Sequence, residues 1–259
     1  MSLARRVREE TLDALAPHDP RAQRSRRDLV RVHRAMGTRG TLVRALRDPP
    51  RVPGTPDALD PLDVLELGAG DGTLMLGVAR RIAGGWPPVR LTLLDRVDIV
   101  TGATRAGFAD LGWQVEVVTT DVLDWATREP PGPARCPDLI VTSLFVHHFE
   151  GAALGALLGA IAARTQRFVA CEPRRDRFAL AGSHLVALLG ANAVTREDAV
   201  LSVHAGFRDA EIGASWPDPD GVWKVREGRG GAFGHLFDAR RRAAVPDRCP
   251  IDEPPVSRR

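Results

Sequence analysis

The chain has 259 residues, of which 44% are hydrophobic, so it is long enough for one large domain or for a core with a cap. The net charge is only +3 although the sequence pI is 9.2, and the arginines are mixed with acidic residues, so we do not predict a nucleic-acid partner. No apolar run reaches the ~18 to 20 residues of a membrane span, the first residues form no secretion signal, and three scattered cysteines show no metal-site spacing, which together predict a cytoplasmic protein.

Residues 1–56 are predicted to form an N-terminal helical cap and its linker. Asp19 followed by Pro20 marks a helix start, and residues 25–36 carry apolar side chains at near-helical spacing. We interpret the arginines around them as a solvated helix face rather than as a ligand-binding group. Five prolines between residues 48 and 61 mark the linker.

Strands and helices alternate in the core domain, residues 57–245. Short apolar runs predict strands at 62–67, 89–95, 113–118, 138–142 and 167–171, and a helix is expected from Gly72 to Ile82. This β-α alternation predicts a parallel sheet with right-handed crossovers.

The C-terminal part of this domain is predicted to cover the substrate and then to close the sheet. Residues 177–205 read as a helical substrate cover, and 206–216 as the last crossover helix. A hairpin is expected over 222–226 and 232–239, and residues 246–259 as a flexible tail. Four polar residues of the cover would line an acceptor pocket or cap helices: Asn192, Thr195, Arg196 and Asp198.

A glycine turn follows the strand predicted at 62–67, and its sequence is E-x-G-x-G-x-G over residues 66–72. A phosphate-binding P-loop would need a lysine here, but the chain's only lysine is Lys224. A dinucleotide loop would need glycine at position 73, which is Thr73. The stretch resembles the first motif of the class I S-adenosylmethionine (SAM) dependent methyltransferases.

This resemblance implies a Rossmann-like α/β fold, a mostly parallel seven-stranded sheet with an antiparallel last strand, and an N-terminal helical cap. It also implies SAM as the cofactor. The residues that we expect to bind the cofactor are Glu66, Gly68, Ala69, Gly70, Asp95, Arg96, Asp121, Val122 and Ser143.

Two aspartates stand at the ends of later strands. Asp95 closes the second strand, where a carboxylate can accept hydrogen bonds from both ribose hydroxyls, and the resembling family binds the SAM ribose there. Asp121 resembles the family's acidic residue at the adenine amino group, with Val122 donating through its backbone; Asp124 is a close competitor. The alternative for each aspartate is a helix cap.

The stretch from Ser143 to Glu150 resembles the L-x-H-H-F segment of small-molecule methyltransferases related to quinone-biosynthesis enzymes. We expect His147 or His148 to be the catalytic base, since histidine suits proton removal at neutral pH. Adjacent residues point in different directions, so at most one should face the acceptor, and a purely architectural role for both stays open. An H-H-x-E metal site lacks a third ligand in the sequence, and no metal is predicted.

Glu172 ends the strand predicted at 167–171. It is expected either to touch the acceptor or to form a salt bridge to the neighbouring arginines, Arg174 and Arg175.

The sequence therefore predicts a SAM-dependent methyltransferase of a small aromatic substrate, acting at a phenolic hydroxyl of a quinone, phenolic-lipid or polyketide-type molecule. C-methylation, RNA methylation and a non-catalytic binding protein with this fold are the alternatives. The N-terminal cap is compatible with a lid or with a homodimer interface.

Overall fold

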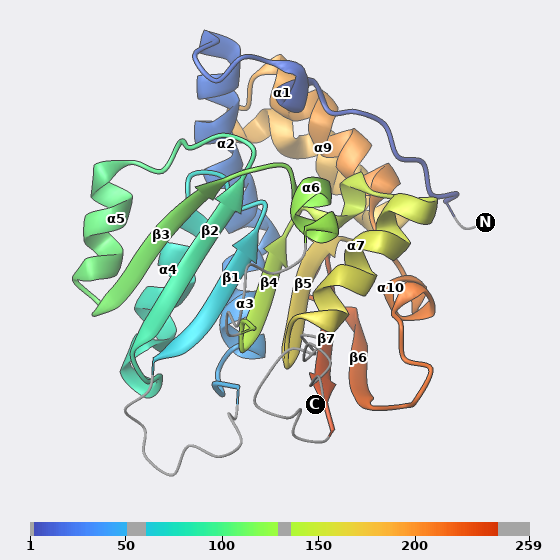
Figure 1. Ribbon diagram of the computed structural model, residues 1–259. Helices are drawn as coiled ribbons and strands as arrows, with labels where there is room; N and C mark the ends of the chain where they lie inside the picture. The colour runs from blue at the N-terminus through green and yellow to red at the C-terminus, as the bar shows by residue number, and fades with distance from the viewer. Residues whose placement is uncertain (1–2, 51–60, 129–135, 243–259) are drawn as a thin grey trace, which may run out of the picture.

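The structure is a computed structural model that describes residues 3–50, 61–128 and 136–242. Seven strands form one sheet in the order β3-β2-β1-β4-β5-β7-β6 (Figure 1). Strand β7 is antiparallel to both of its neighbours, and all other neighbouring pairs are parallel, which confirms the predicted sheet. The strands are β1 Leu62–Leu67, β2 Val89–Asp95, β3 Trp113–Thr119, β4 Leu139–Ser143, β5 Arg167–Pro173, β6 Trp223–Arg229 and β7 Gly234–Arg241.

The strand order reverses between β1 and β4. Strands β2 and β3 lie on one side of β1, and β4, β5 and the closing hairpin lie on the other. In open α/β sheets such a switch point opens a crevice at the carboxyl ends of the strands, and ligands bind there. The residues predicted to bind the cofactor follow β1, β2, β3 and β4 and therefore gather at this edge.

Helices cover both faces of the sheet, because successive side chains of a strand point to opposite faces. Val64 joins the hydrophobic cluster formed with α3 (Thr38–Ala45), α4 (Thr73–Ile82) and α5 (Gly102–Ala109). Leu65 joins the second cluster. Its helices are α6 (Val122–Thr127), α7 (Gly151–Ala163) and α10 (Glu211–Ser215).

The N-terminal part contains α1 (Thr11–Ala14), α2 (Pro20–Met36) and α3. As predicted, Asp19 caps α2 by accepting a hydrogen bond from the backbone of Arg21, and Pro20 is the first helical residue. Among the described helices, none has the length and apolarity that crossing a bilayer requires. Most of the predicted linker and the whole predicted tail lie outside the described residues.

The predicted helical cover is not continuous. It divides into α8 (Arg177–His184), a 3-10 helix η3 (Leu185–Leu189) and α9 (Ala193–Ala205). Gly190 interrupts it with a left-handed φ of 73°, and the Asn192 side chain restarts the helix by accepting a hydrogen bond from the Thr195 N–H at 2.9 Å.

The last crossover helix is much shorter than the predicted range 206–216, since α10 spans only Glu211–Ser215. Gly206 and Phe207 are held against the end of β5, where the Phe207 N–H donates to the Pro173 carbonyl at 2.9 Å. A Cβ on Gly206 would lie 2.3 Å from that same oxygen, so the chain passes too close for a helix to begin there.

Candidate active site

The glycine turn after β1 fits tightly between two neighbours. Gly68 and Gly70 have φ angles of 70° and 57°, which favour glycine. The backbone N–H groups of Gly68 and Ala69 both donate to the Leu94 carbonyl of β2, at 2.9 and 3.1 Å. A Cβ on Gly68 would lie 2.2 Å from the Phe145 ring, so the loop after β4 closes on this turn.

Two buried polar atoms at this edge of the sheet have no hydrogen-bond partner within the described residues. They are Oε2 of Glu66 on β1 and Oγ of Ser143 at the end of β4. Burial, together with the nearby charges of Asp95 and Asp71, raises the pKa of the Glu66 carboxyl well above its usual value. A cationic ligand beside Glu66 would satisfy these atoms and restore the carboxylate.

Asp95 ties the glycine turn to β2. Its Oδ2 accepts a hydrogen bond from Gly70 N–H at 2.8 Å, and its Oδ1 accepts a longer one from Val97 N–H at 3.3 Å. The carboxylate remains half-buried at the crevice. The next residue, Arg96, is exposed and lies 3.5 Å from the carboxylate of Asp13.

Asp121 caps α6, as the alternative interpretation of the sequence had it, with Oδ1 accepting from the Leu123 N–H at 2.7 Å. Its neighbour Val122 is buried. Thr120 N–H donates to the Asp95 carbonyl at 3.0 Å, so the Asp121 turn follows directly on the end of β2. The helix cap uses one carboxylate oxygen of Asp121. The predicted contact of Asp121 with adenine stays a proposal.

Glu172 organises the loop after β4. Its carboxylate is fully buried and accepts hydrogen bonds from the N–H groups of residues 145–147, at 3.1 to 3.3 Å, and from the Thr142 hydroxyl at 3.4 Å. The same loop holds Leu144 at a φ of 52°, a left-handed conformation that is rare for leucine. Such strain is concentrated at functional sites.

Of the two alternatives for Glu172, the salt bridge to Arg174 or Arg175 does not form in the described part of the chain. Arg174 pairs with Asp176 at 2.9 Å, and Arg175 pairs with Glu211 at 2.5 Å. Both arginines lie beyond the end of β5.

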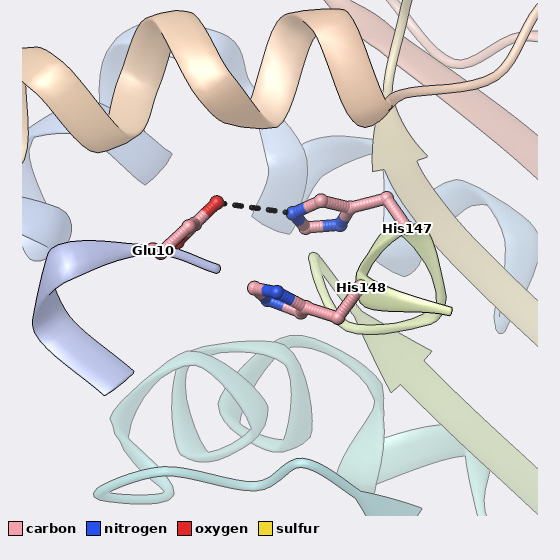
Figure 2. Close-up of side chains that lie close together, drawn as sticks. All are labelled: Glu10, His147 and His148. Atoms are coloured by element: carbon pink, nitrogen blue, oxygen red, sulfur yellow. Dashed lines mark hydrogen bonds and ion pairs between the residues drawn. The ribbon is translucent and has the colours of Figure 1, made fainter. Parts of the chain in front are cut away.

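His147 is buried between two carboxylates, and Figure 2 shows one of them, that of Glu10. Its Nδ1 lies 2.8 Å from Oε2 of Glu172, and its Nε2 lies 3.4 Å from Oε1 of Glu10. Burial opposes the charged ring, but hydrogen bonds and charges from Glu10 and Glu172 outweigh burial and raise the pKa of His147 to about 9. Both nitrogens therefore carry protons at neutral pH, and His147 has no lone pair for an acceptor's proton.

His148 is in a different state. Its side chain keeps 22% exposure, its ring centroid lies 4.3 Å from that of His147, and its Nδ1 is 3.7 Å from Oδ2 of Asp13. Burial and the positive charge of His147 lower the pKa of His148 below the usual 6.5, so its ring is neutral at neutral pH. Of the two predicted bases, only His148 keeps a nitrogen that can accept a proton.

Residues 3–14, which we call the N-terminal strap, cross this edge of the molecule (Figure 1). Arg5 donates to the carbonyls of His147, Phe149 and Ala205, and its guanidinium lies 4.4 Å from the centroid of the Phe207 ring.

Further along the strap, Thr11 and Leu12 N–H groups donate to the Asp198 carboxylate, at 2.8 and 3.0 Å. Glu10 accepts from the Ser202 hydroxyl. The strap therefore brings Glu10 and Asp13 to the two histidines, and neither acidic residue is marked by a motif in the sequence.

Glu10, His147 and His148 each offer one possible metal-ligand atom, and these atoms lie within 4.8 Å of one another. Glu10 thus supplies the third group that the H-H-x-E motif lacks. As folded, however, both nitrogens of His147 face carboxylates, one from Glu172 and one from Glu10, and Figure 2 shows the contact with Glu10.

An apolar cavity of about 330 Å³ lies between α2, α8, η3 and α9 and reaches Leu144 and Glu10. Of the four polar residues of the cover, Thr195 and Asp198 line it, whereas Asn192 caps α9 and Arg196 is exposed. Its apolar lining includes Leu29, Val32, Met36, Leu144, Pro173, Ala179, Leu185, Val186, Leu188, Leu189, Val203 and Phe233.

Solved methyltransferase structures share this architecture. An O-methyltransferase family protein from Burkholderia thailandensis aligns with a TM-score of 0.53 and 17% identity over 86% of this chain and 60% of its own. The N,N-8-amino-8-demethyl-D-riboflavin dimethyltransferase RosA from Streptomyces davawensis gives 0.53 and 16% over 90% of this chain and 62% of its own. This chain has the class I methyltransferase fold.

The pyocyanin biosynthetic protein PhzM has a TM-score of 0.50 and 19% identity, over 90% of this chain and 62% of its own. This chain spans about 60% of the length of each of these three proteins. No protein-family model and no curated protein sequence matches it.

Proposed function

We propose that this protein is a SAM-dependent methyltransferase that methylates a hydroxyl group of a small aromatic acceptor. The observation that carries the proposal is the pair of buried, unpartnered atoms, Glu66 Oε2 and Ser143 Oγ, at the switch point of a methyltransferase fold. Buried polar groups normally have partners, and a ligand with donor groups would supply them here.

The residues present fit SAM. Glu66 would face the cationic end of the cofactor, and the glycine turn lets the backbone approach it closely. Asp95 would hold the ribose, and Asp121 with Val122 the adenine, as the family resemblance implies; Arg96 and Ser143 would flank the site. Bound SAM supplies an activated methyl group, so the chain chiefly has to position the two reactants.

The acceptor would occupy the apolar cavity. Its lining is mostly carbon, which favours an aromatic or otherwise apolar body, and the cavity meets the post-β4 loop at Leu144. His148 would take the hydroxyl proton at Nε2, since Nδ1 faces Asp13. His147 would keep its proton and hold the strap through Glu10.

Calorimetric titration with SAM and S-adenosylhomocysteine tests the proposal. We expect wild-type protein to bind both ligands and Asp95→Ala to lose them. Asp98→Ala is the matched control, because Asp98 is exposed and its carboxylate contacts Arg105 and the Val100 N–H rather than the glycine turn. Folded wild-type protein that binds neither ligand would contradict the proposal.

A second experiment addresses the acceptor. A panel of phenols with and without alkyl substituents would be incubated with SAM, and methylated products would be identified by mass spectrometry. If the methyl group is found on carbon, or on RNA only, the protein is still a methyltransferase, but the proposed hydroxyl acceptor is wrong.

A further inference from the structure

Exposed hydrophobic side chains gather at one place on the described surface. Seven large ones are exposed, and four of these lie on α8 and η3: Phe178, Leu185, Leu188 and Leu189. Leu188 is 81% exposed and Phe178 60%. Single exposed hydrophobic residues are common on protein surfaces, but a group of them marks an interaction site. We call these four residues the apolar rim.

The apolar rim surrounds the opening of the cavity. Leu185, Leu188 and Leu189 line the cavity and also face solvent, so they stand at its mouth. Phe178 stacks on Phe233, another lining residue, with ring centroids 5.1 Å apart. The surface patch and the cavity are therefore one continuous apolar surface.

A row of arginines lies along α2, and one of its members contacts the chain next to the rim. Arg24, Arg27, Arg31 and Arg34 are spaced by three or four residues along α2, which places them on one side of the helix, and all four are exposed. Arg31 contacts the carbonyl of Gly190, directly after η3, at 3.5 Å. We call these residues the arginine row.

The arginine row carries uncompensated positive charge. Within the described ranges, Arg31 pairs with Asp28, whereas Arg24, Arg27 and Arg34 have no carboxylate partner. An apolar rim next to a helix that carries several free arginines matches an anionic phospholipid surface, which offers phosphates at its outside and acyl chains beneath.

We propose that the apolar rim and the arginine row dock on a bilayer that contains anionic phospholipid, with the cavity mouth facing the acyl chains. An apolar ligand would then pass between bilayer and cavity without crossing water. A symmetric contact between two copies is disfavoured, because it would bring the two arginine rows together. This inference rests on the surface alone and not on the proposed methyl transfer.

Vesicle flotation with the full chain tests the proposal. We expect binding to phosphatidylcholine–phosphatidylglycerol vesicles, weak binding to phosphatidylcholine alone, and loss of binding as salt rises. Leu188→Asp, and separately the pair Arg27→Glu with Arg34→Glu, should each weaken binding about tenfold or more.

The matched controls lie on β6, remote from the rim. Val225 is also an exposed apolar residue, and Lys224 and Arg226 are also exposed and basic. Val225→Asp, and Lys224→Glu with Arg226→Glu, should leave vesicle binding unchanged. Circular dichroism establishes that each variant is folded.

Three outcomes would overturn the proposal. The first is no binding of folded wild-type protein to anionic vesicles, and the second is an equal loss in the rim and control variants. The third is a dimer that Leu188→Asp dissociates, with no vesicle binding. SAM titration of the same wild-type protein reports separately on the proposed function, so the two failures are distinguishable.

Discussion

Glu172 and His147 form a buried contact of 2.8 Å between the end of β5 and the loop after β4. The Glu172 carboxylate thereby joins the ring of His147 to the backbone that carries it. Since Gly68 leaves room for Phe145 of this loop, the contact also sets the distance between the loop and the glycine turn. The Glu172 carboxylate thus positions the loop after β4, which lies between the predicted cofactor and acceptor sites.

Replacing Glu172 with glutamine should destabilise the protein strongly. The new amide N–H₂ group would face backbone N–H donors and could not accept their hydrogen bonds. The positive ring of His147 would also lose its buried charged partner, and breaking a buried ion pair typically costs about 3 to 5 kcal/mol. The free energy of unfolding in urea measures this. Glu116→Gln on β3 is the control, since Glu116 is exposed; a comparable loss there would remove the argument.

The stability of the protein should fall as the pH rises through the pKa of His147. The folded-state pKa is raised to about 9 and the unfolded value is about 6.5, so the stabilisation is complete below about pH 6.5 and disappears by about pH 9. At about 1.4 kcal/mol per pKa unit, the change is on the order of 3 kcal/mol. The free energy of unfolding of wild type minus that of His147→Asn, measured across this range, isolates the effect; a flat difference would contradict it.

The fold was predictable because its signals are local. Val89–Asp95 is an apolar run that ends in an acidic residue, and the strand occupies the same bounds in the structure. The order of strands along the chain then brings Glu66, Asp95 and Ser143 to one edge. Where a local signal was weak, as at Gly206, the prediction of a helix failed, because a close backbone approach decides the conformation there.

The surroundings of the histidines were not predictable. Glu10 contacts His147 across 137 positions of sequence, and Asp13 reaches His148 across a similar separation. The sequence position of Glu10 does not mark it as a partner of His147. The contacts that hold the strap in place, made by Arg5 and Asp198, also join residues that are distant in sequence. The sequence therefore indicated two equivalent histidines, and only the tertiary contacts distinguish them.

Gly68→Ala should weaken both folding and SAM binding. The left-handed φ costs an alanine about 1 to 2 kcal/mol, and its Cβ would overlap the Phe145 ring. Adding Phe145→Ala should recover only part of the loss, because the backbone strain remains.

The control for this prediction is Gly155→Ala in α7. Nothing lies within 4 Å of a Cβ at that position, and the change should stabilise the helix by about 0.5 to 1 kcal/mol. Thermal unfolding and SAM titration measure both variants. An unchanged Gly68→Ala protein would mean that the turn and the post-β4 loop are not packed as described.

Arg5→Ala should release the N-terminal strap. The side chain donates to three carbonyls, on the post-β4 loop and at the end of α9, and none of these acceptors has another donor in the strap. Hydrogen exchange of residues 3–14 should become faster, and limited proteolysis should cleave the strap earlier. Arg8→Ala is the control, because Arg8 is exposed; equal exchange in both variants would indicate that Arg5 does not anchor the strap.

Removing His148 should abolish most of the methyl transfer to a hydroxyl acceptor. General-base catalysis contributes about 10² to 10⁴-fold, so His148→Ala should lower kcat by at least about 10². SAM binding should persist, since the ring lies outside the predicted cofactor contacts. Because the pKa of His148 is lowered and the base must be neutral, wild-type activity should fall only as the pH drops below about 6.5.

The control is His184→Ala, which removes an exposed imidazole at the end of α8. Its kcat and its pH profile should match those of wild type. A His148→Ala enzyme that retains both full kcat and the acid limb of the profile would leave both histidines with a structural role. The acceptor would then have to lose its proton without a base from the protein. In that case kcat should depend steeply on the pKa of the acceptor, which a series of phenols of graded pKa would measure.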